Sequence, residues 1–227
     1  MRELLTSEVS ILAFTLALYV GATWIYRKTK LALLHPVLVT ITAIIALLLT
    51  FNIDYITFKK GSHLIDFMLG PSVVALGYTL YTQVEHIKRN AASIITALFV
   101  GAAVGIGSVL LVAKALGSTT LLAITLAPKS VTTPIAIAIS ERFGGIPPLT
   151  AVVVVAVGIL GGIAGPWVLR ILKVDSKIAV GLALGASAHG LGTARAMELG
   201  AIEGAISGLA IGLMGLLTAL LAPFFLA

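Results

Sequence analysis

The chain has 227 residues, of which 59% are hydrophobic and 11% are charged, with a mean hydropathy of +1.13. Because a soluble globular domain carries about 25% charged residues, this composition excludes a soluble protein. The absence of cysteine excludes disulfides, cysteine-ligated metal centres and thiol nucleophiles. The net charge of +6 does not indicate a nucleic-acid partner, since the basic residues stand in short clusters between apolar stretches.

Long uncharged stretches indicate the class of protein. A helix needs about 20 apolar residues to cross the hydrocarbon core of a bilayer. No water is present there to satisfy backbone N–H and C=O groups, so such segments must be helical. One stretch would also fit a buried helix of a soluble protein, but a series of them does not. We therefore predict an all-α, polytopic transmembrane helical bundle that forms a single integral membrane domain, residues 1–227, in the cell membrane. Six stretches of 18 residues or more lack Asp, Glu, Lys and Arg: 9–26, 31–53, 67–84, 90–113, 143–169 and 204–227.

The first predicted span is expected to be retained, because no cleavage pattern of small residues follows it. Basic clusters between spans mark the cytoplasmic side of the membrane. They place the N-terminus outside and let the following spans alternate in direction. In chain order, the regular spans are predicted at 9–26, 31–51, 64–83, 91–113 and 145–169.

The segment 115–140 is irregular, because Pro128, Lys129 and Pro134 interrupt it. If this segment crossed the membrane, the basic cluster that begins at Arg170 would lie outside. If it is re-entrant or broken, that cluster lies inside. The positive-inside rule favours the second alternative, and both stay open.

The chain also partly repeats itself at an offset of 57 residues, which pairs Leu69 with Leu126, Pro71 with Pro128, Val74 with Val131, Gly101 with Gly158 and Gly105 with Gly162. This pattern predicts an internal repeat, 64–114 and 121–171, whose halves are parallel or inverted, followed by a second broken-helix unit at 178–227. Paired, proline-interrupted segments are the best sequence pointer to the binding site of a transporter. Helix breaks are predicted at Pro71, Pro128 and Pro134.

The first polar group within the apolar sequence is 128–134, Pro-Lys-Ser-Val-Thr-Thr-Pro. A lysine at mid-membrane costs about 3 kcal/mol or more on insertion scales, so Lys129 points to a function. Together with a half-helix that starts near Pro134, the ammonium and the neighbouring hydroxyls would suit an anion. The alternative is that Lys129 reaches to the interface while the hydroxyls repair the broken backbone. The hydroxyls belong to Ser130, Thr132 and Thr133.

The second polar group lies at 185–195, where two glycines interrupt a predicted helix. Arg195 offers a planar fork that matches a carboxylate. His189 can bind substrate or carry a coupled proton. Alternatively, Arg195 marks an interface and pairs with Glu198 or Glu203, which are also candidates for proton coupling. Predicted substrate contacts in this group are Ser187, His189, Gly190, Gly192, Thr193 and Arg195.

Catalysis is not expected. The sequence around Ser187 is similar to the Gly-x-Ser of intramembrane serine proteases, but no histidine follows His189 to serve as a base. No metal-ligand spacing and no phosphate-binding loop occurs, so neither a metal nor a cofactor is predicted.

Four segments, PKSVTTPIA (128–136), the Gly-Gly-x-x-x-Leu-Thr-Ala of 144–151, AHGLGTARAMELG (188–200) and EGAISGLA (203–210), resemble the LrgB/CidB family. The resemblance covers nearly the whole chain. It implies an antiholin-like protein that modulates murein hydrolase activity and lysis. It also implies a carrier of small monocarboxylates, since relatives are associated with pyruvate uptake and the similar half of the plastid glycolate/glycerate translocator exchanges those two acids. A separate LrgA/CidA-like membrane partner is implied as well.

From these observations we expect a secondary transporter for glycolate, glycerate or pyruvate, with Lys129 and Arg195 supplying positive charge to a small organic anion. The alternative is a holin-like pore or antiholin-like regulator of lysis. A homodimer in the lipid bilayer is expected in the first case. The uncharged C-terminus of the chain differs from the charged tail that is typical of holins.

Overall fold

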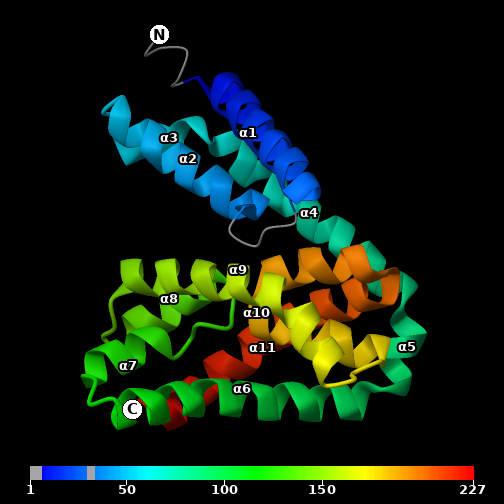
Figure 1. The fold of residues 1–227 in the computed structure, drawn as a ribbon. Helices are drawn as coiled ribbons and strands as arrows, with labels where there is room; N and C mark the ends of the chain where they lie inside the picture. The colour runs from blue at the N-terminus through cyan, green and yellow to red at the C-terminus, as the bar shows by residue number, and fades with distance from the viewer. Residues whose placement is uncertain (1–6, 30–33) are drawn as a thin grey trace. The chain divides into compact units, whose positions relative to one another are not determined.

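The computed structural model describes residues 7–29 and 34–227. Within them the chain is helical and contains no strand, which confirms the predicted fold class (Figure 1). The helices are α1 (Glu8–Thr29), α2 (Pro36–Thr50), α3 (Tyr55–Gly61), α4 (His63–Thr82), α5 (Val84–Arg89), α6 (Ala91–Ala115), α7 (Thr120–Leu126), α8 (Thr133–Arg142), α9 (Pro147–Ile171), α10 (Lys177–Leu199) and α11 (Ala201–Leu226).

Four of these helices, α1, α6, α9 and α11, are long and apolar enough to cross a membrane. Their lengths of 22 to 26 residues fit the requirement of about 20 residues for one crossing. The shorter α2 is also apolar. A multi-pass membrane protein therefore follows from the helices themselves, and the predicted spans at 9–26, 91–113 and 145–169 coincide closely with α1, α6 and α9.

The chain divides into two compact units, residues 1–75 and 76–227. In the first unit α1 packs against α2 and α3, and Ile11 and Ala22 of α1 are buried. Asp54 caps α3, because its carboxylate accepts a hydrogen bond of 3.2 Å from the backbone N–H of Ile56. Short helices at α3 and α5 were not predicted, since neither sequence is long or apolar enough to signal a span.

In the second unit α10 packs against α9 and α11, and α11 packs against α6 (Figure 1). Large apolar side chains of α6 form one wall of the buried core. Side chains from residues 127–132, α8, α9 and α11 complete this hydrophobic cluster. Its buried members are Ile94, Leu98, Ala102, Val131, Ala136, Val154, Ile206, Ala210 and Met214.

Glycines set how closely α9, α10 and α11 approach each other. A Cβ built on Gly161 of α9 would lie 2.5 Å from the Cβ of Ala188, and one on Gly181 of α10 would lie 2.5 Å from the carbonyl oxygen of Glu203. Since lipid tails are as apolar as the helices, close van der Waals contact is what holds helices together in a bilayer. These glycines are therefore required by packing.

The prediction of a helix break at Pro71 is wrong. Helix α4 continues through this residue, whose side chain is exposed. A proline removes one backbone hydrogen bond, and a membrane helix tolerates that loss when neighbouring turns adjust. Pro128, its partner in the predicted repeat, lies in the non-helical residues 127–132 between α7 and α8. The two positions thus differ in backbone, and the internal repeat stays a prediction.

Candidate functional site

The first polar group lies between two short helices. In residues 127–132 the backbone N–H of Lys129 donates to the carbonyl of Leu126 at 3.1 Å, a turn that does not continue as a helix. Pro128 is buried at this point. Helix α8 then begins with Pro134 in its first turn, where the missing N–H costs nothing because first-turn donors have no helical partner.

Lys129 is half-buried, and its ammonium donates to the hydroxyl of Ser130 at 2.9 Å. In the described part of the chain, no carboxylate pairs with it. The neighbouring Thr132 is the N-cap of α8, but its side chain makes no capping bond to that helix. Positive charge and uncapped N–H groups therefore occur together at the start of α8, which is a combination that suits an anion.

A cluster of hydroxyls that the sequence analysis missed joins α7, α8 and α9. The hydroxyl of Thr150 lies 2.9 Å from the carbonyl oxygen of Thr125 and 2.7 Å from the hydroxyl of Ser140. The hydroxyl of Thr125 in turn accepts from the backbone N–H of Ile146 at 3.0 Å. All three hydroxyl side chains are fully buried. Isolated Ser and Thr residues in apolar stretches are the only signal of such a cluster, and they do not reveal their partners.

The second polar group contains a break inside α10. His189 has φ 41° and ψ −126°, a left-handed backbone conformation that residues other than glycine rarely adopt. Its ring is buried and its Nε2–H donates to the carbonyl of Val154 on α9 at 3.0 Å. A Cβ built on Gly158 would lie 2.6 Å from the Cε1 atom of this ring. The imidazole therefore occupies a socket on α9 that exists because residue 158 is glycine.

The other residues of this group have separate partners. The Thr193 hydroxyl bonds that of Ser207 on α11 at 2.7 Å, and both are buried. The exposed Ser187 donates to the carbonyl of Ala183 in its own helix at 2.6 Å. The two buried hydroxyls thus satisfy each other, as burial requires, while Ser187 bonds its own backbone.

At the C-terminal end of α10, Arg195 makes one of the two ion pairs considered from the sequence. Arg195 forms an ion pair with Glu198 on the next turn, and their side chains are 41% and 64% exposed. Glu203 is buried in the first turn of α11 instead. Gly190 is exposed, whereas a Cβ on Gly192 would lie 2.8 Å from that of Ala188.

Taken together, the contacts attach the second group to α9 through His189 and to α11 through Thr193. No hydrogen bond among the described residues links either group to the other. Nor do three or more His, Asp or Glu side chains of the described ranges gather as a metal ion would need.

Comparison with known proteins places these features in a family. The model of the LrgB-like family matches residues 15–227. The chain is 40% identical over 216 residues to the uncharacterized protein YwbG of Bacillus subtilis (strain 168), covering 95% of this chain and 96% of that protein. It is 34% identical over 209 residues to the holin-like protein CidB of Staphylococcus aureus (strain Mu50 / ATCC 700699), covering 92% and 91%.

A third relative is the antiholin-like protein LrgB of Bacillus mycoides (strain KBAB4), which is 31% identical over 226 residues, covering 100% of this chain and 98% of that protein. No solved structure matches. The chain is similar to these relatives over nearly its whole length, and it has membrane-crossing helices. Both findings agree with the resemblance of its sequence motifs to the LrgB/CidB family. The chain is a member of the LrgB-like family and a multi-pass protein of the cell membrane.

Proposed function

We propose that this protein is a holin-like or antiholin-like component of the cell membrane, which changes the permeability of the membrane and so modulates murein hydrolase activity and lysis. The observation that carries the proposal is its likeness, over more than nine-tenths of both chains, to relatives named holin-like and antiholin-like. The relatives' names support this class of activity, and the membrane-crossing helices support a location in the bilayer.

The structure supports this proposal through the two irregular segments of the second unit. Residues 127–132 are non-helical, and α10 departs from helical geometry at His189. Irregular backbone at membrane depth is tolerated where protein buries it or where it lines a water-filled path. A change in membrane permeability would arise where such segments rearrange.

A lysis assay tests the proposal in cells. Cells that lack the protein and cells that overproduce it are treated with a cell-wall inhibitor, and the decline of turbidity is followed. A holin-like protein accelerates lysis when overproduced, and an antiholin-like protein delays it. Equal lysis rates in both strains and in the parent would contradict the proposal.

A second candidate is a carrier for small monocarboxylates such as glycolate, glycerate or pyruvate. Lys129 favours it, because its half-buried ammonium bonds only the Ser130 hydroxyl within residues 7–29 and 34–227, and such a group can hold a carboxylate. Ser130, Thr132 and Thr133 would bind the remaining oxygens. Arg195 would contribute only after exchanging Glu198 for the substrate, and the His189 ring would have to release Val154.

Counterflow of labelled pyruvate or glycolate in proteoliposomes tests the carrier. Saturable exchange is expected, and Lys129→Gln should reduce it at least about tenfold, the loss of one charge-assisted contact. Lys177→Gln is the matched control, since Lys177 is exposed at the start of α10. If both variants exchange as the unmodified protein does, Lys129 does not bind the substrate.

Assembly is part of the same proposal. We expect a homodimer that works beside an LrgA/CidA-like membrane partner. Crosslinking of the purified protein in lipid, with and without co-expression of such a partner, measures the homodimer and its association with the partner.

A further inference from the structure

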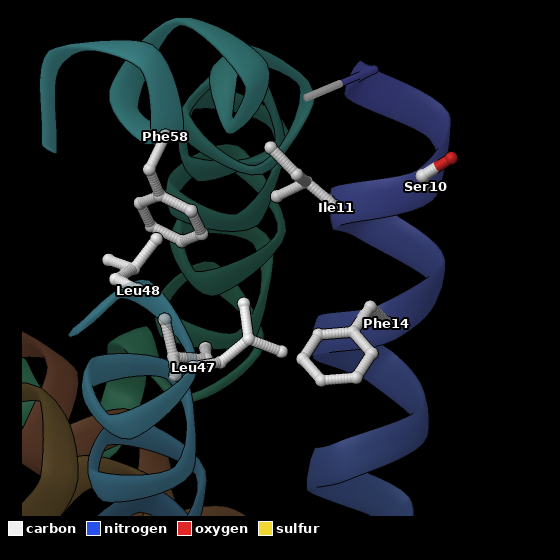
Figure 2. Close-up of a pocket in the computed structure, with 7 residues that line it drawn as sticks. Ser10, Ile11, Phe14, Leu47, Leu48 and Phe58 are labelled. Carbon is white, nitrogen blue, oxygen red and sulfur yellow. The ribbon is translucent and has the colours of Figure 1, made fainter. Parts of the chain in front are cut away.

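An apolar pocket lies in the first unit, between α1, α2 and α3 (Figure 2). Its volume is about 20 Å³, so it seats only a small group. Figure 2 shows Ile11 and Phe14 of α1 facing Phe58 and Leu47 across it, while the hydroxyl of Ser10 points away. That hydroxyl accepts instead from the hydroxyl of Ser7 at 2.7 Å. The interior is therefore purely hydrocarbon.

A larger, open cavity of about 620 Å³ is lined from α1, α3 and α4. Two of its lining residues are close in sequence to residues of the apolar pocket. Glu8 precedes Ser10 by two residues on α1, and Lys59 follows Phe58 on α3. The remaining lining side chains come from both ends of α3 and from the first turn of α4. The full lining is Glu8, Ile56, Lys59, Lys60, His63 and Asp66.

The charges around this cavity have both signs and no partners. Across residues 7–29 and 34–227, no ion pair joins Glu8, Lys59, Lys60 or Asp66 to an opposite charge. Two ammonium groups and two carboxylates thus face one space without neutralising each other. An occupant that carries one anionic and one cationic group would match them.

The position along α1 sets the depth of this site. Glu8 is the first residue of a helix that is long and apolar enough to cross the membrane. It therefore lies where the hydrocarbon core gives way to head groups, about 15 Å from the bilayer centre. Ile11 and Phe14 follow on the core side of this level.

We propose that this end of the first unit binds a phospholipid whose head group is zwitterionic and carries a primary ammonium. Lys59 and Lys60 contact the phosphate, Glu8 and Asp66 accept hydrogen bonds from the ammonium, and the apolar pocket takes the first methylenes of an acyl chain. A primary ammonium is required because a trimethylated one has no N–H to donate to the carboxylates. An anionic lipid would satisfy the lysines but leave both carboxylates unpaired.

Native mass spectrometry of the purified full-length protein tests the proposal. Phosphatidylethanolamine, phosphatidylcholine and phosphatidylglycerol with identical acyl chains are titrated separately. Binding of phosphatidylethanolamine should be about tenfold tighter than that of the other two. Soluble phosphoethanolamine should not compete, since it lacks the acyl chain.

Two charge variants, K59Q/K60Q and E8Q/D66N, should each weaken phosphatidylethanolamine binding about tenfold while keeping the wild-type Tm. K173Q/K177Q, a pair of exposed lysines in the second unit, is the matched control and should bind normally. Ile44→Trp fills the apolar pocket without changing charge and should also weaken binding. Equal binding of all three lipids, unaltered binding by the charge variants, or full competition by phosphoethanolamine would overturn the proposal.

Discussion

Two helices of the second unit, α6 and α9, carry the same Gly-xxx-Gly spacing and use it in opposite ways. A Cβ built on Gly101 or Gly105 of α6 would meet no atom within 4 Å. Helix α9 has the pairs Gly158/Gly162 and Gly161/Gly165, and a Cβ at Gly158, Gly161 or Gly165 would lie 2.5 to 2.6 Å from a side-chain atom of α10. The spacing permits close helix approach but does not determine whether a partner helix makes it.

The difference arises from which residues of each helix contact the neighbouring helices. Helix α6 contributes large side chains to the core, with Ile94 and Leu98 each 1% exposed. Helix α9 instead meets α10 through its glycines, which leave room for the side chains of Leu184, Ala188 and His189. Mutations that add a methyl group can therefore distinguish the two helices.

The largest effect is expected at Gly161. Gly161→Ala places two Cβ atoms 2.5 Å apart, so α9 and α10 must separate. The free energy of unfolding should fall by about 2–3 kcal/mol, at the upper end of overpacking costs. Gly105→Ala, the matched control on α6, should leave Tm unchanged or slightly raised, because alanine favours helix over glycine. Equal Tm losses in both variants would contradict the comparison.

A coupled effect is expected between Gly158 and His189. Gly158→Ala blocks the socket of the imidazole, and His189→Ala empties it, so each variant should lower Tm. In the double variant the added methyl enters the emptied space. The double loss should therefore be smaller than the sum of the single losses by about 1 kcal/mol or more. Additive losses would show that the ring does not occupy the socket.

A smaller loss is expected at the N-terminal end of α9, where Thr150→Val removes the hydroxyl that bonds Thr125 and Ser140. Loss of partners for buried polar groups should cost about 1–2 kcal/mol in thermal unfolding. Thr50→Val is the control, because this exposed hydroxyl bonds only the Ala46 carbonyl of its own helix. If the two valine variants unfold alike, the buried cluster does not hold α9.

The smallest effect is expected at the exposed ion pair of α10. Arg195→Gln should change stability by less than about 1 kcal/mol, since solvent screens a pair whose side chains are 41% and 64% exposed. Denaturant unfolding measures it. A loss as large as that of Gly161→Ala would mean that charge, not packing, holds α10 in place.

The sequence predicted the helices better than their contacts. Uncharged stretches located α1, α6 and α9 within a few residues, because membrane depth leaves a lone segment little choice but helix. The contact of His189 with Val154 and the bonds of Thr150 join residues far apart in the chain, so no local pattern reveals them. Pro71 shows the opposite failure, since a strong local signal did not interrupt α4.

Release of solutes of graded size from proteoliposomes that contain the purified protein tests the functional proposal most directly. A protein that changes membrane permeability should release small solutes faster than large ones, and faster than protein-free vesicles do. If the vesicles retain every solute as tightly as empty ones, the holin-like assignment is contradicted.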